Sequence, residues 1–194
     1  MKNWNHFKTV TYHKFLVLKG CWSVGLMMQG ICHDLSKYSW TEFRVGAMYF
    51  QGNRSPNNAE REDIGYSTAW MHHKGRNKHH YEYWMDYGIQ GKKVGIIPVP
   101  MPTKYIVEML MDRIAACKVY EKEKYQDDSP LRYYMRSREV NPLHEKTQFM
   151  LELLLTMMAE KGQKETFRFI RQVLLKERRT LDEPDGWKIL QKSS

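Results

Sequence analysis

The stretch Gly30-Ile31-Cys32-His33-Asp34-Leu35-Ser36-Lys37-Tyr38-Ser39 carries a histidine-aspartate dyad between two predicted helices. Apolar residues at helical spacing predict a long helix over 9–29. Ser39 and Glu42 have the S-x-x-E spacing in which a serine caps a helix and the glutamate reaches back, so a second helix is expected just after Ser39. The dyad is therefore expected at a junction between helices.

Histidines and carboxylates gather around the dyad. Five of the eight histidines lie between positions 33 and 80. Imidazole nitrogens and carboxylate oxygens are the ligands that divalent transition metals share. An aspartate in the middle of an apolar helix, as at Asp112, is costly to bury unless it is paired or metal-bound. The pattern predicts a metal site, with these candidate ligands: His13, His33, Asp34, His72, His73, His79, His80 and Asp112.

The four later histidines leave the ligand set open. His72 and His79, like His73 and His80, would lie two turns apart on a continuous helix, about 10.5 Å along its axis. That separation is too large for both to bind one ion at about 2.1 Å. Either Gly75 breaks the helix and folds the second pair back, or only one pair binds metal. We rank His72 and His80 slightly above their neighbours.

Composition narrows the class of protein. The chain has 194 residues, three cysteines without a C-x-x-C pair, and a formal charge of +9. No stretch approaches the roughly 20 apolar residues that cross a bilayer, and the N-terminus lacks a signal-peptide pattern. We expect a cytoplasmic protein without a membrane partner. The charge would attract nucleotides, phosphorylated metabolites or nucleic acid, and does not choose among them.

The remaining chain is predicted to be nearly all helical. Helices are expected over 59–73, from Thr103 to Lys124, and over 143–161 and 163–179 on either side of Gly162, with an irregular stretch or hairpin over 87–102 and a basic, tyrosine-bearing loop after position 125. The fold class is therefore all-α. We expect a metal-binding helical core over 1–125, with a C-terminal helical extension over 126–194 packed on the same domain.

The order H…HD…H…H…D resembles the HD-domain superfamily of metal-dependent phosphohydrolases. His33-Asp34-Leu35-Ser36-Lys37 looks like the H-D-[IL]-G-K motif of that group, with Ser36 in place of glycine. The resemblance covers about residues 9–120, and 30–39 also resembles a small family of uncharacterised bacterial and phage proteins. No G-Y-P follows the histidine pair, which argues against the cyclic-dinucleotide phosphodiesterase branch.

The resemblance implies an HD-domain-like helical bundle with additional C-terminal helices. It also implies that His13, His33, Asp34 and Asp112 hold one divalent ion, that Asp34 bridges to a second, and that histidines among 72–80 complete the second position. Mn, Fe, Mg, Co and Zn are all suitable ions, and their number is expected to be two.

The activity that the resemblance implies is hydrolysis of a nucleotide or other small phosphate ester by a metal-activated water. Asp34 would position the nucleophile. Lys37 and Arg76 would neutralise the charge that develops on the phosphoryl oxygens, with Lys37 the better placed. The expected partner is thus a small anionic substrate, with nucleic acid as a further possibility.

Two other functions fit the same residues. HD-type proteins with extra histidines include di-iron oxygenases, and metal identity would separate these from hydrolases. A non-catalytic interaction protein with a structural metal is the other alternative, in which the basic C-terminal helices engage the partner.

Several residues near the candidate ligands have simpler interpretations. Glu108 is expected to be an exposed helical neighbour of Asp112, although it could instead support a ligand. His6 and His144 are expected to be surface or capping residues. The basic stretch 161–180 is expected to pack one face and solvate the other. Aromatic residues are expected in the helical core rather than in a stacking wall for a nucleobase: Tyr38, Trp40, Trp70, Tyr81, Tyr83 and Trp84.

Overall fold

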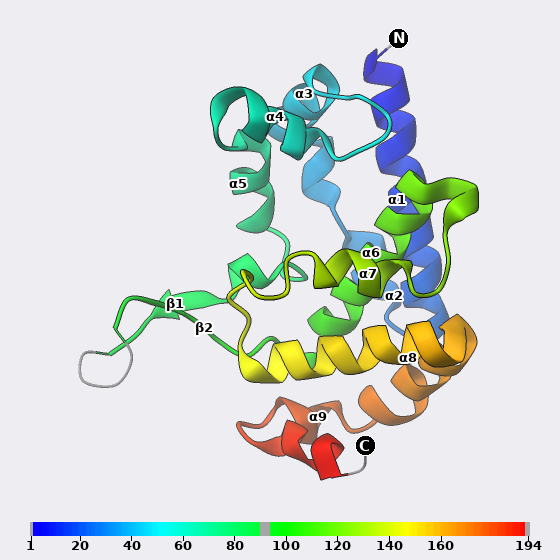
Figure 1. The fold of residues 1–194 in the computed structure, drawn as a ribbon, viewed down its shortest axis with the longest axis vertical. Coiled ribbons are helices and arrows are strands. Elements are labelled where there is room, and N and C mark those ends of the chain that lie inside the picture. The colour runs from blue at the N-terminus through cyan, green and yellow to red at the C-terminus, as the bar shows by residue number, and fades with distance from the viewer. Residues whose placement is uncertain (1, 90–93, 193–194) are drawn as a thin grey trace.

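The computed structural model describes residues 2–89 and 94–192 and has an all-α fold with one small hairpin, as the sequence predicts (Figure 1). The α-helices are α1 (Lys2–Val24), α2 (Met27–Cys32), α3 (Trp40–Met48), α4 (Pro56–Ile64), α5 (Thr68–Lys74), α6 (Thr103–Glu121), α7 (Ser129–Met135), α8 (Glu145–Phe169) and α9 (Arg178–Asp182). Short 3₁₀ turns are η1 (Leu35–Tyr38), η2 (Tyr81–Tyr83), η3 (Lys122–Lys124) and η5 (Gly186–Lys192), and Ile170–Leu174 is a π-helical turn. Figure 1 shows α3, α4 and α5 at one end of the molecule and α8 and α9 at the other.

The first helix differs from its prediction. The single helix predicted over 9–29 is wrong, because α1 already begins at Lys2 and the chain turns at Gly25, which has a φ of 90°. The turn lets α2 fold back against α1. Lys14 on α1 then donates hydrogen bonds to the carbonyls of Ile31 (2.7 Å) and His33 (2.8 Å). The reversal therefore fixes the dyad beside the middle of α1.

The helix predicted over 59–73 is also divided. Gly65, with a φ of 85°, ends α4, and Ser67 caps α5 by accepting a hydrogen bond from the backbone of Trp70 at 3.0 Å. The predicted break at Gly75 is confirmed, since α5 ends at Lys74. The short α5 consequently delivers its last residues close to the dyad.

Two other predicted helix starts hold. Ser39 caps α3 by accepting from the backbone N–H of Glu42 at 3.4 Å, and α6 begins at Thr103. The stretch predicted as irregular or a hairpin forms β1 (Met85–Tyr87) and β2 (Ile96–Pro98), an antiparallel pair that projects from the helices (Figure 1). Residues 90–93 of that stretch lie outside the described residues.

The region after position 125 contains one further correction. The basic, tyrosine-bearing stretch predicted as a loop includes α7, which buries Tyr134 completely. The predicted interruption at Gly162 is confirmed, because its backbone (φ 75°, ψ 171°) is not helical. The helix after Gly162 does not continue to position 179 but passes into the π-helical turn at Ile170.

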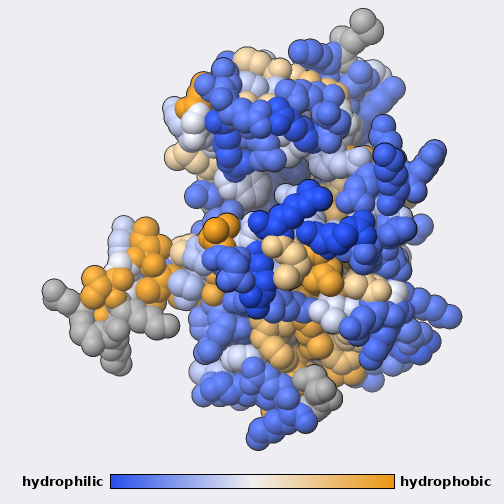
Figure 2. Space-filling view, in the orientation of Figure 1, coloured by the Kyte–Doolittle hydropathy of each residue, from blue (hydrophilic) through white to orange (hydrophobic). Residues whose placement is uncertain are grey.

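The apolar core lies where α1, α6 and α8 meet. Its cluster joins residues from both sides of position 125, such as Val17, Leu110 and Leu154. Ile170 and Leu174 are fully buried in it, so the stretch 161–180 packs as predicted. The visible surface is mostly hydrophilic, with apolar residues gathered on the hairpin (Figure 2). Among the described residues, no helix is both long and apolar enough to cross a membrane.

Candidate metal centre

A second, polar core lies between α1, the dyad, the segment after α5, and α6. His6, Val10, His13 and Val17 recur at spacings of four, three and four residues and form the buried face of α1. On α6, Glu108 and Asp112 are four residues apart and thus share a face. Three separate segments and the dyad therefore bring polar side chains to one place.

The first ligand set contains His13, His33, Asp34 and Asp112, whose ligand atoms all lie within 4.8 Å of one another. The Nε2 atom of His13 is 2.9 Å from Oδ1 of Asp112, and Nε2 of His33 is 3.4 Å from the same oxygen and 3.3 Å from Oδ2 of Asp34. Ligands about 2.1 Å from one ion are about 3.0–3.4 Å apart in octahedral or tetrahedral geometry. The spacing fits a shared cation.

The second set contains Asp34, His73, His79 and His80. Nε2 of His73 lies 3.2 Å from Oδ1 of Asp34 and 2.9 Å from Nε2 of His80, and Nε2 of His79 lies 3.4 Å from the same Asp34 oxygen. The chain reverses after Gly75, where Asn77 donates to the carbonyl of His73 at 2.8 Å. The sequence left two alternatives open for the later histidines. In the structure the chain folds back after Gly75 and brings His79 and His80 to the same site as His73.

Asp34 is the residue that the two sets share. Its Oδ2 faces His33 and its Oδ1 faces His73, and it is only 1% exposed. Its backbone has a φ of 54°, in the left-handed region that non-glycine residues rarely adopt. Strain of this kind is typical of functional positions.

Glu108 holds one histidine of each set. Its Oε1 accepts hydrogen bonds from Nδ1 of His33 at 3.0 Å and from Nδ1 of His79 at 3.1 Å. The expectation that Glu108 is exposed is wrong, since it is 5% exposed. These three residues also satisfy the spacing of a third possible metal group. We assign hydrogen bonds instead, because both imidazoles direct Nε2 into the two larger sets.

Glu42 holds histidines of α5 in the same way as Glu108 holds His33 and His79. Its two oxygens accept from Nδ1 of His72 (2.6 Å) and Nδ1 of His73 (2.7 Å). A carboxylate accepts and does not donate, so each contacting Nδ1 carries the proton and the opposite Nε2 presents a lone pair. Carboxylates hold metal-binding histidines in this way. The sequence indicated only a capping role for Glu42.

The polar core contains buried atoms that lack ordinary partners. Nε2 of His13, His33 and His79, and Oδ1 of Asp34, are buried and make no hydrogen bond of regular geometry among the described residues, whereas Oδ2 of Asp34 has the ammonium of Lys37 at 2.6 Å. Such atoms are costly to desolvate, and lone pairs that converge repel one another. A divalent cation between them removes both costs. The donor sets therefore fit metal ions.

The electrostatics keep the carboxylates anionic but do not keep every histidine neutral. Burial would lower the pKa of His33 and of His73, but Asp34 and the other acidic neighbours outweigh burial and raise both, so these two imidazoles must release a proton when they bind a metal. Burial alone would raise the pKa of Asp34, but His33, Lys37 and His73 outweigh it and hold that pKa well below the usual range. Burial and the neighbouring histidines lower the pKa of His80 far below its ordinary value. Anionic carboxylates and neutral imidazoles are the metal-binding forms.

The structure does not bring every candidate into these sets. His72 bonds to Glu42 and lies outside both, although we ranked it with His80. Arg76 is exposed and donates to the carbonyl of His72 at 3.1 Å. Lys37, by contrast, places its Nζ 2.6 Å from Oδ2 of Asp34. Of the two expected cationic groups, Lys37 is the one at the centre.

Two other histidine expectations have different outcomes. His6, expected at the surface or as a cap, is 6% exposed and packs against the rings of Phe43 and Phe50. His144 is a capping residue as expected, since its Nδ1 accepts from the backbone of Lys146 at 3.2 Å.

The prediction that the aromatic residues lie in the helical core is only partly correct. Tyr81 and Trp84 pack against the apolar core, Trp70 stacks on His73, and Trp40 is 74% exposed.

Comparisons with known proteins give the family and no activity. Neither the search of curated proteins nor that of solved structures found a match. One family model matches residues 2–157, a range that includes every residue of the two ligand sets. The chain therefore belongs to a family of unknown function, DUF5662.

Proposed function

We propose that this protein is a metal-dependent phosphohydrolase of the HD-domain type that acts on a nucleotide or other small phosphate ester. The observation that carries the proposal is the sharing of Asp34 between two ligand sets, one with His13, His33 and Asp112 and one with three later histidines. The order of these residues along the chain is the order that resembles the HD-domain superfamily.

The chain's own residues supply positioning and charge. Divalent ions held here would lower the pKa of a bound water and polarise phosphoryl oxygens. Glu42 and Glu108 fix the imidazoles that would bind such ions. Burial disfavours the charge of Lys37, but Asp34 outweighs burial and raises the lysine pKa, so this ammonium stays positive. It can then attract a phosphoryl oxygen.

One side of the metal centre is partly exposed to solvent, and this exposure favours a catalytic metal over a purely structural one. The side chains of Asp112 and Lys37 are 18% and 29% exposed, whereas that of Asp34 is 1% exposed. Structural metal sites are closed by protein ligands, and catalytic ones keep an open position. We infer that the substrate approaches from the side of Asp112 and Lys37.

A di-iron oxygenase is the second candidate, favoured by one observation. The second set offers three imidazoles and one carboxylate, and imidazole is a ligand that suits iron as well as zinc. Protein purified with iron that turns over only with oxygen would support the oxygenase and exclude the hydrolase.

The test is metal analysis of the full chain purified without added metal, followed by a panel of nucleotides and phosphate esters. We expect two divalent ions per chain and release of phosphate. Asp34→Ala should lose both ions and the activity, while Asp86→Ala, at an exposed carboxylate on β1, should keep both. If metal content and activity survive Asp34→Ala, the site assignment fails.

A further inference from the structure

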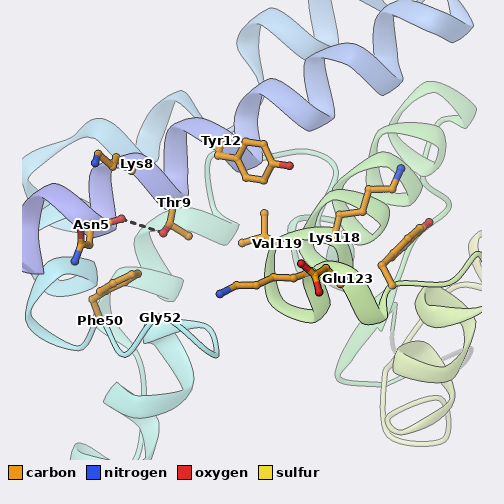
Figure 3. Close-up of a pocket in the computed structure, with 11 residues that line it drawn as sticks. Asn5, Lys8, Thr9, Tyr12, Phe50, Gly52, Lys118, Val119 and Glu123 are labelled. Carbon is orange, nitrogen blue, oxygen red and sulfur yellow. Dashed lines mark hydrogen bonds between the residues drawn. The ribbon is translucent and has the colours of Figure 1, made fainter.

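An open groove with a volume of about 860 Å³ lies between α1, the loop after α3, and the end of α6 (Figure 3). On α1 it is lined by Asn5, Thr9 and Tyr12. These residues lie on a different face of α1 from the buried His6 and His13. The groove and the metal centre are thus formed by the same pair of helices but on different faces.

Lysines outnumber the one acidic residue, Glu123, among the described residues along the walls of the groove. Lys8 on α1 and Lys122 in η3 line it from different elements, and both are exposed. Lys118 also lines it but donates to Gln163 at 2.8 Å. The chain as a whole carries a charge of +9. A ligand of this groove is expected to be anionic.

Aromatic rings accompany the lysines. Tyr12 is 54% exposed and Phe50 is partly exposed, so neither ring is fully covered by the core. Figure 3 shows Tyr12 extending from α1 toward α6, with Phe50 toward the other end of the groove. A positively charged groove with accessible aromatic rings is the arrangement that binds single-stranded nucleic acid, since every base can stack on a ring.

The shape of the groove favours a polymer over a small molecule. Sites for small ligands bury roughly 70–90% of the ligand surface. Here Lys8, Tyr12 and Lys122 are all exposed, so a single nucleotide would remain largely in water. An extended strand gains contacts at several points along the groove instead.

Lys122 has a backbone that the fold alone would not favour. Its φ of 52° and ψ of −119° lie in a region that suits glycine. Asp34, at the metal centre, is the other non-glycine residue with a positive φ in the described part of the chain. Lys122 is also the C-cap of α6, where the chain turns into η3.

We propose that this groove binds single-stranded nucleic acid, with bases against Tyr12 and Phe50 and phosphates near Lys8 and Lys122. The site goes beyond the proposed hydrolase and does not depend on it. Asp34→Ala should abolish phosphate release and leave strand binding unchanged, so the two proposals fail separately.

The experiment is fluorescence anisotropy with a labelled ten-nucleotide oligothymidylate, measured over a range of salt concentrations on the full chain. Lys122→Gly should weaken binding about tenfold and reduce the slope of log K against log salt by about 0.7, because one phosphate contact is lost. The same variant should raise the thermal midpoint, because glycine relieves the strain. Lys176→Ala, with the same loss of charge at an exposed lysine outside the groove, should bind as the wild type does.

The aromatic contact is tested separately. Tyr12→Ser should weaken binding about tenfold without changing the salt slope, since stacking does not release counterions. The proposal is overturned if Lys122→Gly raises the thermal midpoint but binds the strand as the wild type does. It is also overturned if thymidine monophosphate competes as well as the strand, which would make the groove a small-molecule site.

Discussion

The molecule has two cores of opposite character, one around Leu154 and one around Asp34. Helix α6 belongs to both, with Leu110 in the apolar cluster and Glu108 and Asp112 in the polar one. Leu154 is fully buried and Asp34 is 1% exposed, so burial does not distinguish the cores. What differs is how each buried group is satisfied.

The apolar core is stabilised by removal of surface from water, which has no preferred direction. The polar core depends on direction, because each Nε2 and each carboxylate oxygen must face a particular partner. The buried Glu42 and Glu108 orient the imidazoles, and the buried imidazole nitrogens that lack a hydrogen bond indicate a cation between them. We therefore expect the apolar core to determine folding stability and the polar core to determine metal affinity.

Truncation in the apolar core should have the largest effect on stability. Leu154→Ala is expected to lower the free energy of unfolding by about 3–5 kcal/mol, because it leaves a cavity in a fully buried site. Metal content per folded chain should not change. Denaturant unfolding and metal analysis measure the two effects, and Val140→Ala, at a residue 78% exposed, is the control. A loss of metal from folded Leu154→Ala would contradict the separation of the cores.

Removing a carboxylate that supports the histidines should change metal affinity rather than folding stability. Glu108→Gln is expected to weaken metal binding about 10–100-fold at both positions, because its Oε1 holds His33 of one set and His79 of the other. Glu42→Gln should weaken only the second position, through His73. Metal titration measures both affinities. Loss of affinity at only one position in Glu108→Gln would show that Glu108 does not bridge the sets.

A buried histidine outside the ligand sets should make stability depend on pH. Burial, with a smaller contribution from Lys37, lowers the pKa of His6 from 6.5 to about 4. As pH falls from 7 to 5, the unfolded chain takes up the proton first, so this residue's contribution to stability is lost. The expected loss is about 2 kcal/mol.

The His6 effect is isolated by comparing unfolding of the wild type and His6→Gln across the same pH range. Both proteins keep the metal centre, so its own pH dependence cancels. Parallel curves for the two proteins would show that His6 is protonated equally in the folded and unfolded states.

The helix cap beside the dyad should have the smallest effect. Ser39→Ala is expected to destabilise the protein by about 0.5–1 kcal/mol through loss of the hydrogen bond to the backbone of Glu42. Ser55 precedes α4 but makes no side-chain capping bond, so Ser55→Ala should have almost no effect. Thermal unfolding measures both, and similar losses in the two variants would contradict the capping role.

The sequence predicted elements whose signals are local. The cap at Ser39, the start of α6 and the breaks at Gly75 and Gly162 follow from residue types at fixed spacing. The turn at Gly25 was missed because a glycine inside an apolar helical pattern is compatible with either a continuous helix or a reversal.

For the metal centre too, the sequence predicted what depends on residue type and missed what depends on how the helices pack. The sequence singled out every residue of both ligand sets from its type and order, and it also included His72 and Arg76, which lie outside. It could not assign Glu108, although the four-residue spacing to Asp112 placed the two on one helix face. A glutamate there is exposed or buried according to which helix packs against it.

By itself, then, the sequence determined the fold class and the chemistry available, because helix periodicity, caps and ligand residue types are properties of short segments. Only the tertiary structure decided that the chain reverses after Gly75, that Asp34 serves both sets, and that Glu42 and Glu108 orient the histidines. These depend on contacts between segments far apart in the chain, such as the 75 residues that separate His33 from Glu108. Such contacts depend on how helices pack, which local spacing does not encode.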